Sequence, residues 1–505
     1  MRHLLLLFTC WASALRAPLP PPAAVAAFAA SLGGALVTSS SPLYTNASAE
    51  WNARVSSAPY AIVFVASEAD VALSLGFAEA WALPLALRSG RHQVEGWSVC
   101  TACLVIDVSS LAAVRVDTAA RRVTVGAGVT LGALLNETVP LGWHTPSGSC
   151  SSVGVAGYTL GGGIGWTSRL YGLAVDNLLG ARIVLANGSI IDLAVPGAGD
   201  DDLAWSLTGG GGGNFGVVTQ LTLALHPMPP QLLYAEFAYP WSAAVDASAA
   251  YLEAARKDPR FLFYCLYVRP SSDPEPSVLL QGIWLGDLGE GRAALQPLVE
   301  LAVASNASGG ASAMVVATDY LTAHQRFEGP LGSRTANKQK SALVARADPP
   351  SALPPCVSAP ALALLRAALL SAPADVADNS AVYLNALGGA IALPQPNATA
   401  FVHREALLNW VVDAHWRRNE STPAGLAWAR AVYGALADAG YLGEANAVYV
   451  NYSDNDLDEG IWPAAYYGDE GYARLQRTKA AVDAGGRFSF PQSVRLPGIS
   501  HLRDS

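Results

Sequence analysis

The alternation of apolar and polar positions divides the chain into two parts of different character. From residue 60 the pattern predicts a strand at 61–65, an amphipathic helix at 68–81 and a second strand at 84–87. Apolar runs at 104–108, 114–116, 123–125, 181–185 and 190–193 predict further strands, and residues 131–137 a short helix. A proline-rich stretch at 226–230 marks the expected boundary of this part.

Residues 231 to 445 contain longer stretches rich in alanine and leucine. Helices are expected at 243–257, 361–371, 403–416 and 424–439, and strands at 262–268 and 278–284. A sheet covered by helices is the simplest arrangement of these elements, so the predicted fold class is α+β. From residue 446 the chain is again turn-rich, with many polar and aromatic residues.

The N-terminus has the form of a secretory signal. A charged start precedes the apolar run Leu4 to Phe8 and small residues as far as Ala17, so residues 1–17 are expected to be a signal peptide. The apolar run is too short to span a bilayer. Asn-X-Ser/Thr triplets fit the same compartment, and we expect a secreted, extracellular glycoprotein. The triplets begin at Asn46, Asn136, Asn187, Asn306, Asn397, Asn419 and Asn451.

Composition indicates a large core and narrows the partners. Of 505 residues, 51% are hydrophobic and 14% charged, and the net charge is −9. This length exceeds what one core usually supports, which favours two domains. The sequence has no block of basic residues, so we expect no nucleic-acid partner.

The cysteines leave several alternatives open. Cys100 and Cys103 form a lone C-x-x-C, which suits a redox pair, half of a metal site or two ordinary thiols. The sequence has no second such pair with zinc spacing, so no metal is expected. Cys265 and Cys356 are candidates for a disulfide in an oxidising compartment, although sequence gives no connectivity.

Glycine is concentrated in loops where it alternates with apolar residues. Stretches such as 148–165 and 209–213 let backbone N–H groups approach an anion closely. A flexible linker is the alternative, but linkers lack the interleaved valine, isoleucine and leucine found here. We therefore expect a nucleotide cofactor whose phosphates lie against these loops.

Four motifs, in this order along the chain, resemble those of the berberine bridge enzyme-like flavin oxidases. They are Arg88-Ser-Gly-Arg-His92, Gly148-Ser-Cys150 continuing to Gly163, Gly213-Asn-Phe-Gly216, and Tyr449-Val-Asn-Tyr452. These oxidases belong to the vanillyl-alcohol oxidase superfamily, whose FAD domain is of the p-cresol methylhydroxylase (PCMH) type. The resemblance extends over residues 40 to 495.

The resemblance implies a division of the chain and a set of FAD contacts. It implies a two-part PCMH-type FAD-binding domain at 40–230, a substrate domain with an antiparallel sheet covered by helices at 231–445, and a berberine bridge-type segment at 446–495 that returns to the FAD domain. His92 would bond to the flavin 8α-methyl group and Cys150 to flavin C6. The other cofactor-binding residues that it implies are Arg88, Ser89, Gly90, Ser149, Val153, Gly154, Gly157, Gly161, Gly162, Gly213, Asn214, Gly216, Val218 and Asn451.

The resemblance also implies a reaction. A substrate C–H gives a hydride to flavin N5 while Tyr452, with Tyr449 beside it, takes the hydroxyl proton; without the motif, both tyrosines would be taken for packing residues. Gly388-Gly389 is not followed by the carboxylate that some alkaloid-oxidising relatives use, which favours the tyrosine. Val153 resembles the small gate residue of the oxidases, so the expected electron acceptor is O2 and the product H2O2.

Three positions depart from the family pattern. Arg91 stands where the family usually has Gly, Gln93 where Asp is common, and Ile164 where plant relatives place Tyr. A positive φ at position 91 would strain Arg91 and bear on the attachment through His92.

Three functions remain open. The first is a secreted FAD-linked oxidase of an alcohol or of a sugar's anomeric carbon, with a small-molecule substrate and O2 as its partners and no membrane partner. The second is oxidation or cyclisation of a specialised metabolite, and the third is a flavin-retaining glycoprotein with lapsed catalysis. Tyr320, Trp284 and Tyr383 are candidates for stacking on a sugar, although such residues more often pack in a core. The sequence indicates neither the substrate nor the oligomeric state.

Overall fold

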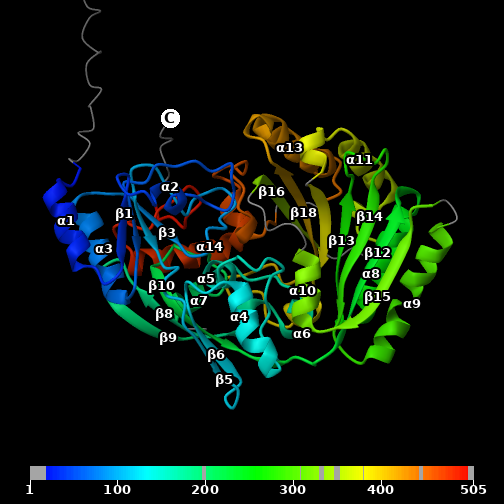
Figure 1. Cartoon of the computed structure of the whole chain (residues 1–505), viewed down its shortest axis with the longest axis horizontal. Coiled ribbons are helices and arrows are strands. Elements are labelled where there is room, and N and C mark those ends of the chain that lie inside the picture. Colours follow the sequence, from blue (N-terminus) through cyan, green and yellow to red (C-terminus); the bar gives the residue numbers. More distant parts are fainter. Residues whose placement is uncertain are drawn as a thin grey trace, which may run out of the picture.

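The computed structural model of the chain describes residues 19–195, 201–306, 309–328, 335–345, 353–378, 380–442 and 447–498. The expected signal peptide lies outside these residues. Figure 1 shows two halves side by side: the N-terminal strands share one half with the C-terminal helix α14 (Trp462–Val482), and the largest sheet fills the other half.

The N-terminal sheet contains a β-α-β unit, as the hydrophobic pattern predicts. Its strand order is β1-β2-β4-β3, in which β2, β4 and β3 are parallel and β1 is antiparallel. Helix α3 (Glu68–Ala80) begins after Ser67, whose hydroxyl accepts a hydrogen bond from the Asp70 N–H group. The strands are β1 (Ala35–Thr38), β2 (Ala61–Phe64), β3 (Leu85–Arg88) and β4 (Leu104–Asp107), and α1 (Pro22–Ser31) and α2 (Tyr44–Ala47) flank them.

The second sheet of this half is antiparallel, with the strand order β5-β6-β10-β8-β9. Helix α5 packs on β10, and the glycine-rich loop that follows α7 leads into β10. Its strands are β5 (Val114–Asp117), β6 (Arg122–Gly126), β8 (Leu178–Val184), β9 (Ile190–Ala194) and β10 (Val217–Ala224), with β7 (Trp143–His144) and β11 (His226–Pro227) paired at one side. The helices are α4 (Leu131–Thr138), α5 (Val155–Leu160), α6 (Ser168–Tyr171) and α7 (Asp202–Ser206).

The C-terminal segment packs into the core of this first half. Val448, Trp462, Leu475 and Phe488 belong to the same buried cluster as the strands of both sheets. The chain therefore crosses to the other half, forms the large sheet and returns.

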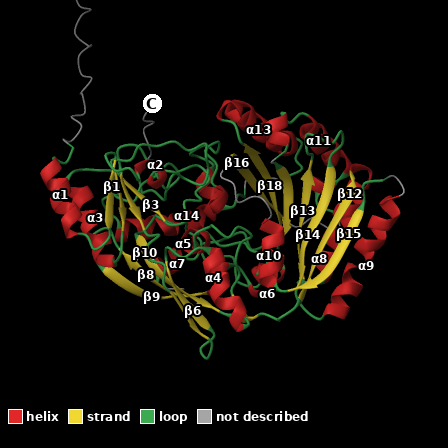
Figure 2. Ribbon diagram, in the orientation of Figure 1, coloured by secondary structure: helices red, strands yellow, loops and turns green. Residues whose placement is uncertain are grey.

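The large sheet is antiparallel, with the order β15-β12-β14-β13-β17-β18-β16. One face packs on α8, α9, α11 and α13, and Figure 2 shows α9, α11 and α13 outside the sheet. The strands are β12 (Leu232–Pro240), β13 (Phe261–Val268), β14 (Ser277–Trp284), β15 (Ser312–Thr318), β16 (Ala336–Ala345), β17 (Ala381–Ala386) and β18 (Ala406–Trp416). The helices are α8 (Ala244–Lys257), α9 (Leu288–Ser305), α10 (Tyr320–Glu328), α11 (Ala359–Leu370), α12 (Ala374–Ala377) and α13 (Thr422–Asp438).

The helix expected at 403–416 is wrong, because this segment forms strand β18. It pairs with β16 on one side and with β17 on the other. Both faces of a central strand are covered, so apolar residues occupy both faces and the two-residue alternation of a half-exposed strand is lost. Such a run is easily mistaken for a buried helix.

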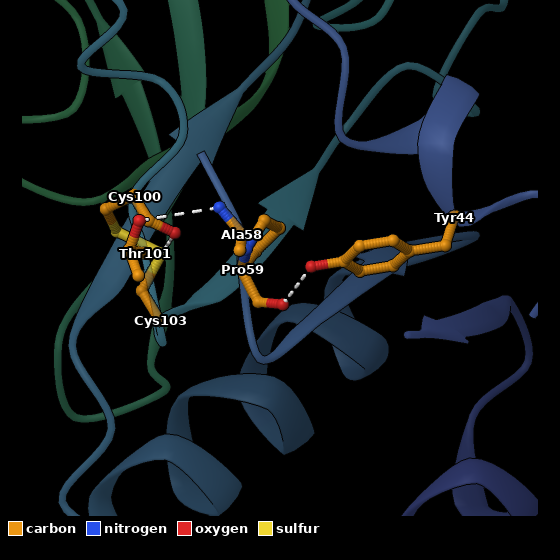
Figure 3. Close-up of a disulfide and its surroundings, with 6 residues drawn as sticks. All are labelled: Tyr44, Ala58, Pro59, Cys100, Thr101 and Cys103. Atoms are coloured by element: carbon orange, nitrogen blue, oxygen red, sulfur yellow. Dashed lines mark hydrogen bonds between the residues drawn. A yellow bond between two sulfur atoms is a disulfide. The ribbon is translucent and has the colours of Figure 1, made fainter. Parts of the chain in front are cut away.

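The structure also settles the cysteine pairing among the described residues. Cys100 and Cys103 form a disulfide (Figure 3), with their Cα atoms 5.6 Å apart. It lies beside the entry to β2, where the Ala58 N–H group donates to the Thr101 hydroxyl. The suggested bond between Cys265 and Cys356 is wrong, since both thiols are free and buried in the second core.

Candidate active site

A cavity of about 700 Å³ lies between the two halves, within the range usual for small-molecule sites. Its walls come from segments far apart in the sequence: the loop after β3, the glycine-rich loops around α5 and before β10, the cavity-side face of the large sheet, and residues 449–453. The cofactor and substrate positions expected from the sequence therefore meet in one space.

Most of the predicted cofactor residues line this cavity. Arg88, Ser89, Gly90, His92, Ser149, Cys150, Val153, Gly154, Gly157, Gly213, Asn214, Gly216, Val218, Asn451, Tyr449 and Tyr452 are on its wall. Gly161 and Gly162 are not, and they pack behind it. A Cβ atom at Gly161 would lie 2.0 Å from Asn451 Oδ1, and one at Gly162 would lie 2.9 Å from the Phe401 ring.

The glycines of the cavity wall are of two kinds: some border open space, and others allow two loops to pack closely. A Cβ atom at Gly157 would meet no atom within 4 Å, and at Gly212 and Gly213 the nearest atoms would be 3.8 and 3.7 Å away. Because these three glycines line the cavity, side chains there would project into the space. Gly90 and Gly154 instead let two loops touch, since a Cβ atom at Gly90 would lie 2.2 Å from the Gly154 nitrogen.

His92 is held in the loop that follows β3. Its ring stacks on Trp51 with centroids 4.7 Å apart, and Nε2 lies 2.9 Å from Ser152 Oγ. Burial lowers the pKa of His92 to about 4, so the imidazole is neutral at pH 7.

Arg91 occupies a left-handed backbone conformation, with φ of 62°. Glycine adopts this region without strain, whereas a non-glycine residue costs roughly 1–2 kcal/mol there. The Arg91 guanidinium donates to the Asn46 carbonyl at 3.0 Å and lies 3.7 Å from Asp107. Arg91 still lines the cavity, while its guanidinium is held beside Asp107 at the end of strand β4.

Cys150 is a free thiol on the facing loop. Its Sγ lies 3.5 Å from Ser152 Oγ. Burial raises the pKa of the Cys150 thiol, and the hydroxyl and backbone N–H of Ser152 act in the opposite direction. The next residue, Ser151, donates from its backbone N–H and hydroxyl to the Glu328 carboxylate at 2.8 and 2.5 Å, which ties this loop to α10.

Arg88 and Asn214 line the cavity but direct their side chains into the protein. The Arg88 guanidinium is fully buried between Glu50 and Asp107, at 3.2 and 2.7 Å. The Asn214 side chain donates to the Gly210 carbonyl and accepts from the Val494 N–H group. These two side chains hold their loops, and their backbone is what faces the cavity.

The two tyrosines of the C-terminal motif differ in their surroundings. The Tyr449 hydroxyl oxygen accepts three hydrogen bonds, from the N–H groups of Gly163 and Ile164 at 2.9 and 3.1 Å and from Asn451 Nδ2 at 2.8 Å. The Tyr452 hydroxyl accepts from the Tyr383 hydroxyl at 3.0 Å. Burial raises the pKa of Tyr449 and of Tyr452. Tyr449 is therefore fixed in place, whereas Tyr452 is the phenol left to meet a substrate.

Alternate residues of strands β13, β16, β17 and β18 of the large sheet form most of the opposite wall, and Phe327 of α10 and Thr335 before β16 complete it. Asp413 and His415 lie two residues apart on β18, and His415 Nε2 is 2.8 Å from Asp413 Oδ1. Gln339 donates to the same oxygen at 3.0 Å, and Thr335 lies 2.8 Å from His415 Nδ1. Burial opposes the imidazolium, but the Asp413 charge and hydrogen bond prevail and raise the pKa of His415. The cavity-facing residues of this wall are Tyr264, Leu266, Val268, Phe327, Thr335, Gln339, Ala381, Tyr383, Asp413 and His415.

Two of the three aromatic residues proposed for sugar stacking do not reach the cavity. Trp284 is 1% exposed and packs in the second core, and Tyr320 is 1% exposed beside His144 and Trp166. Tyr383 does line the cavity. Stacking roles for Trp284 and Tyr320 are therefore wrong.

A group of charged residues, here called the ion network, lies behind the Tyr452 segment, and its centre at Lys338, Glu95 and Asp454 is buried. Lys338 on β16 bridges Glu95 and Asp454, at 2.5 and 2.6 Å. Lys340 contacts Asp454 and Asp456 at 2.6 and 2.9 Å. Arg54 and Arg430 complete the network through Glu95 and Asp456. The network joins the loop of His92, the large sheet and the segment that carries Tyr452.

The cavity fits a flavin nucleotide in three respects. Open glycines leave backbone exposed along one side, which suits a pyrophosphate. Within the described residues, the buried hydroxyl of Tyr158 on the cavity wall has no hydrogen-bond partner, so it is available to a ligand. A neutral imidazole and a thiol also face the same space from two loops.

Comparison with known proteins also indicates a flavin-binding protein. The model of the FAD binding domain family matches residues 59–194, and that of the family described as berberine and berberine like matches residues 448–495. An uncharacterized FAD-linked oxidoreductase of Bacillus subtilis, YvdP, is 30% identical over 465 residues, which cover 92% of this chain and 98% of that protein. The aclacinomycin-N/aclacinomycin-A oxidase of Streptomyces galilaeus is 30% identical over 481 residues, with 86% and 85% covered.

Solved structures share the fold. BBE-like 1 of Physcomitrella patens superposes with a TM-score of 0.78 at 23% identity, over 94% of this chain and 99% of that one. The chain therefore belongs to the berberine bridge enzyme-like FAD-linked oxidases of the PCMH-type superfamily. It is an FAD-linked oxidoreductase, and FAD is its cofactor.

Several wall residues were missed by the sequence reasoning. Asp413 and His415 escaped because their segment was assigned to a helix; read as a strand, their two-residue spacing would have placed both on one face. Trp51 on the wall, and Ser152 beside His92, carry no motif signal of their own. Tyr158 lines the cavity, but nothing in its glycine-rich segment distinguishes it as a site residue.

Proposed function

We propose that the protein is a secreted FAD-dependent oxidase that takes a hydride from a substrate C–H carrying a hydroxyl group, with O2 as the electron acceptor and H2O2 as the product. The observation that carries the proposal is the meeting of His92, Cys150 and Tyr452 around one cavity. These residues come from three segments that are brought together only by the fold. An alcohol or the anomeric carbon of a sugar is the proposed substrate group.

When bound, FAD supplies the acceptor for the substrate's two electrons and passes them to O2. The open glycines at 157, 212 and 213 would hold its pyrophosphate, while His92 and Cys150 would bond covalently to its ring. Val153, beside Cys150 on the wall, is small enough to leave the ring open to O2.

Tyr452 would remove the hydroxyl proton of the substrate. Burial raises its pKa, so the phenol is protonated at neutral pH unless a donor stabilises the phenolate. Tyr383 is placed to do so, since its hydroxyl donates to the Tyr452 oxygen at 3.0 Å. Tyr449, whose oxygen already accepts three hydrogen bonds, would hold the loop at 163–164 instead of reacting.

The test is Tyr452→Phe, which removes the oxygen and keeps the ring. Peroxide release with an active donor should fall by roughly 10²–10⁴-fold, the usual contribution of a general base. The FAD content, from the visible spectrum, should stay at the wild-type level. Tyr171→Phe is the matched control, because the Tyr171 hydroxyl bonds to the Pro227 carbonyl outside the cavity wall. Wild-type activity in Tyr452→Phe would remove the tyrosine from this role.

A second candidate is oxidation or cyclisation of a specialised metabolite. The aromatic side chains of Tyr264, Phe327 and Tyr383 line the substrate wall and suit a flat, apolar substrate. The similarity to an aclacinomycin oxidase supports the same choice. Peroxide release from sugars and from aromatic alcohols, compared side by side, separates the two. A flavin spectrum that bleaches with none of these donors would favour a glycoprotein with lapsed catalysis.

Secretion is part of the proposal. The Cys100–Cys103 disulfide is typical of oxidising compartments. Six of the seven triplet asparagines are exposed, as glycan acceptors must be. Asn451 differs, because its amide donates to the Tyr158 backbone carbonyl and to the Tyr449 hydroxyl within the site. None of the described helices is long and apolar enough to cross a membrane.

A further inference from the structure

One serine touches both side chains that are proposed to bond to FAD. Ser152 Oγ lies 2.9 Å from His92 Nε2 and 3.5 Å from Cys150 Sγ. His92 is 60 residues away in the sequence, so the contact depends on the crossing of the two loops. Ser152 is not among the residues that line the cavity; it stands behind the two that do.

The hydrogens of this group can be assigned from chemistry. A serine hydroxyl has one hydrogen to donate and can accept as well. Neutral His92 carries one N–H group, and among the described residues its Nδ1 has no hydrogen-bond partner. If Nε2–H donates to Ser152 Oγ and the hydroxyl donates to Cys150 Sγ, the imidazole N–H and the serine O–H each have an acceptor. This direction leaves a lone pair on His92 Nδ1 and stabilises negative charge on the Cys150 sulfur.

We propose that Ser152 is a positioning residue for both covalent attachments, because its single hydroxyl fixes the tautomer of His92 and activates the Cys150 thiol. The inference rests on the proposed attachment of FAD to these two residues. It assigns the nucleophiles as Nδ1 of His92 and the thiolate of Cys150.

Each attachment is an oxidation that balances with O2. A new N–C or S–C bond replaces one C–H bond of the cofactor and one N–H or S–H bond of the protein. The two hydrogens and their electrons reduce O2 to H2O2. When Nδ1 of His92 forms its bond, the proton on Nε2 must leave, and Ser152 Oγ can relay it by accepting this proton while its own hydroxyl hydrogen passes to solvent water, to which Ser152 is exposed.

The loop does not depend on the Ser152 hydroxyl for its position. Ser151 holds it through Glu328, and Gly154 packs on Gly90. Ser152 is exposed, so an added methyl group has room. These features supply the variants: Ser152→Ala removes the hydroxyl, Ser152→Thr keeps it, and Ser151→Ala disturbs the same loop at the other contact.

The experiment follows attachment in full-length protein produced in a riboflavin-starved host and mixed with FAD in air. Samples are quenched at intervals, and peptide mass spectrometry gives the flavin-bearing fraction of the His92 and Cys150 peptides. We expect Ser152→Ala to slow attachment at both residues by roughly tenfold or more, the effect of losing a hydrogen bond to a charged group. Ser152→Thr should restore both rates, and Ser151→Ala should leave both within about threefold of the wild type.

Three results would overturn the inference. Unchanged rates in Ser152→Ala would show that the hydroxyl is dispensable. If Ser152→Ala loses attachment at His92 alone and keeps normal attachment at Cys150, the Ser152 hydroxyl does not activate the Cys150 thiol, and the proposed shared role is wrong. A wild-type protein with no covalent flavin at either residue would overturn the proposed attachment itself. The peptide mass spectrum of the wild-type protein distinguishes that result from the other two.

Discussion

Replacing Lys338 by Met tests how strongly the ion network stabilises the junction of the two halves. The Lys338 side chain is 2% exposed and bridges Glu95 and Asp454. Methionine has a similar length and keeps the apolar packing of the stem, so the substitution removes chiefly the charge. Two buried carboxylates then lose a shared cation.

The magnitude follows from what each carboxylate retains. Removing one partner of a buried ion pair destabilises a protein by about 3–5 kcal/mol. Glu95 keeps Arg54 at 2.8 Å and Asp454 keeps Lys340 at 2.6 Å, which favours the lower end, about 3 kcal/mol. A chain of 505 residues unfolding as one unit has an unfolding entropy of about 1 kcal/mol per kelvin, so Tm should fall by about 3 °C.

Differential scanning calorimetry of the FAD-loaded protein measures this shift. Lys257→Met is the matched control, because Lys257 pairs with Glu253 on an exposed helix face and its side chain is 72% exposed. Its Tm should change by less than about 0.5 °C. A Lys338→Met shift as small as that of the control would refute the reasoning that losing this buried cation destabilises the protein although Arg54 and Lys340 remain.

Three further outcomes follow from the cavity and the two cores. Burial lowers the pKa of His144 to about 3 in the folded protein, whereas the unfolded value is near 6.5. Between these two values the unfolded chain binds a proton that the folded protein does not, so the free energy of unfolding falls as the pH falls below 6.5. About 3 kcal/mol of stability is lost between pH 7 and pH 4. His144→Gln should flatten that part of a Tm-against-pH curve, and an unchanged slope would contradict the assignment. Asp413→Asn should raise KM for an active donor roughly tenfold with little change in kcat, whereas a loss confined to kcat would place Asp413 in the chemistry. Cys265 and Cys356, whose pKa values burial raises to about 12, should resist alkylation until the protein is denatured; rapid labelling of the native protein would show that the second core opens.

The sequence predicts the cofactor half of the protein better than the substrate half. The residues of a motif such as Arg88-Ser-Gly-Arg-His92 are consecutive in the sequence, so the end of strand β3 brings all of them to the same place, because neighbouring Cα atoms are only about 3.8 Å apart. The pattern at 403–416 has no such constraint. Its apolar residues are compatible with a buried helix and with a buried strand. The segment forms a strand because β16 and β17, which are distant in the sequence, pair with it on both sides.

Long-range polar contacts are the other part that sequence could not supply. Lys338 lies 243 residues from Glu95 and 116 from Asp454, and no local pattern links them. The same holds for Ser152, whose role depends on a histidine 60 residues away. Such contacts can be identified only from the tertiary structure, which shows that the two loops cross and that the C-terminal segment returns to the first half.

The alternation of side chains along the large sheet has a consequence for how this protein would acquire new substrates. On the central strands, one residue in two faces the cavity and its neighbours belong to the helix-covered core. A mutation of a cavity-facing residue can therefore alter donor choice without disturbing the packing that keeps the strand in place. The flavin loops lack this freedom, since Gly90 and Gly154 admit no larger residue. A library restricted to one face of the sheet should yield folded, FAD-loaded variants with shifted preferences, and natural divergence among relatives would be expected to follow the same path. The positions for such a library are 264, 266, 268, 381, 383, 413 and 415.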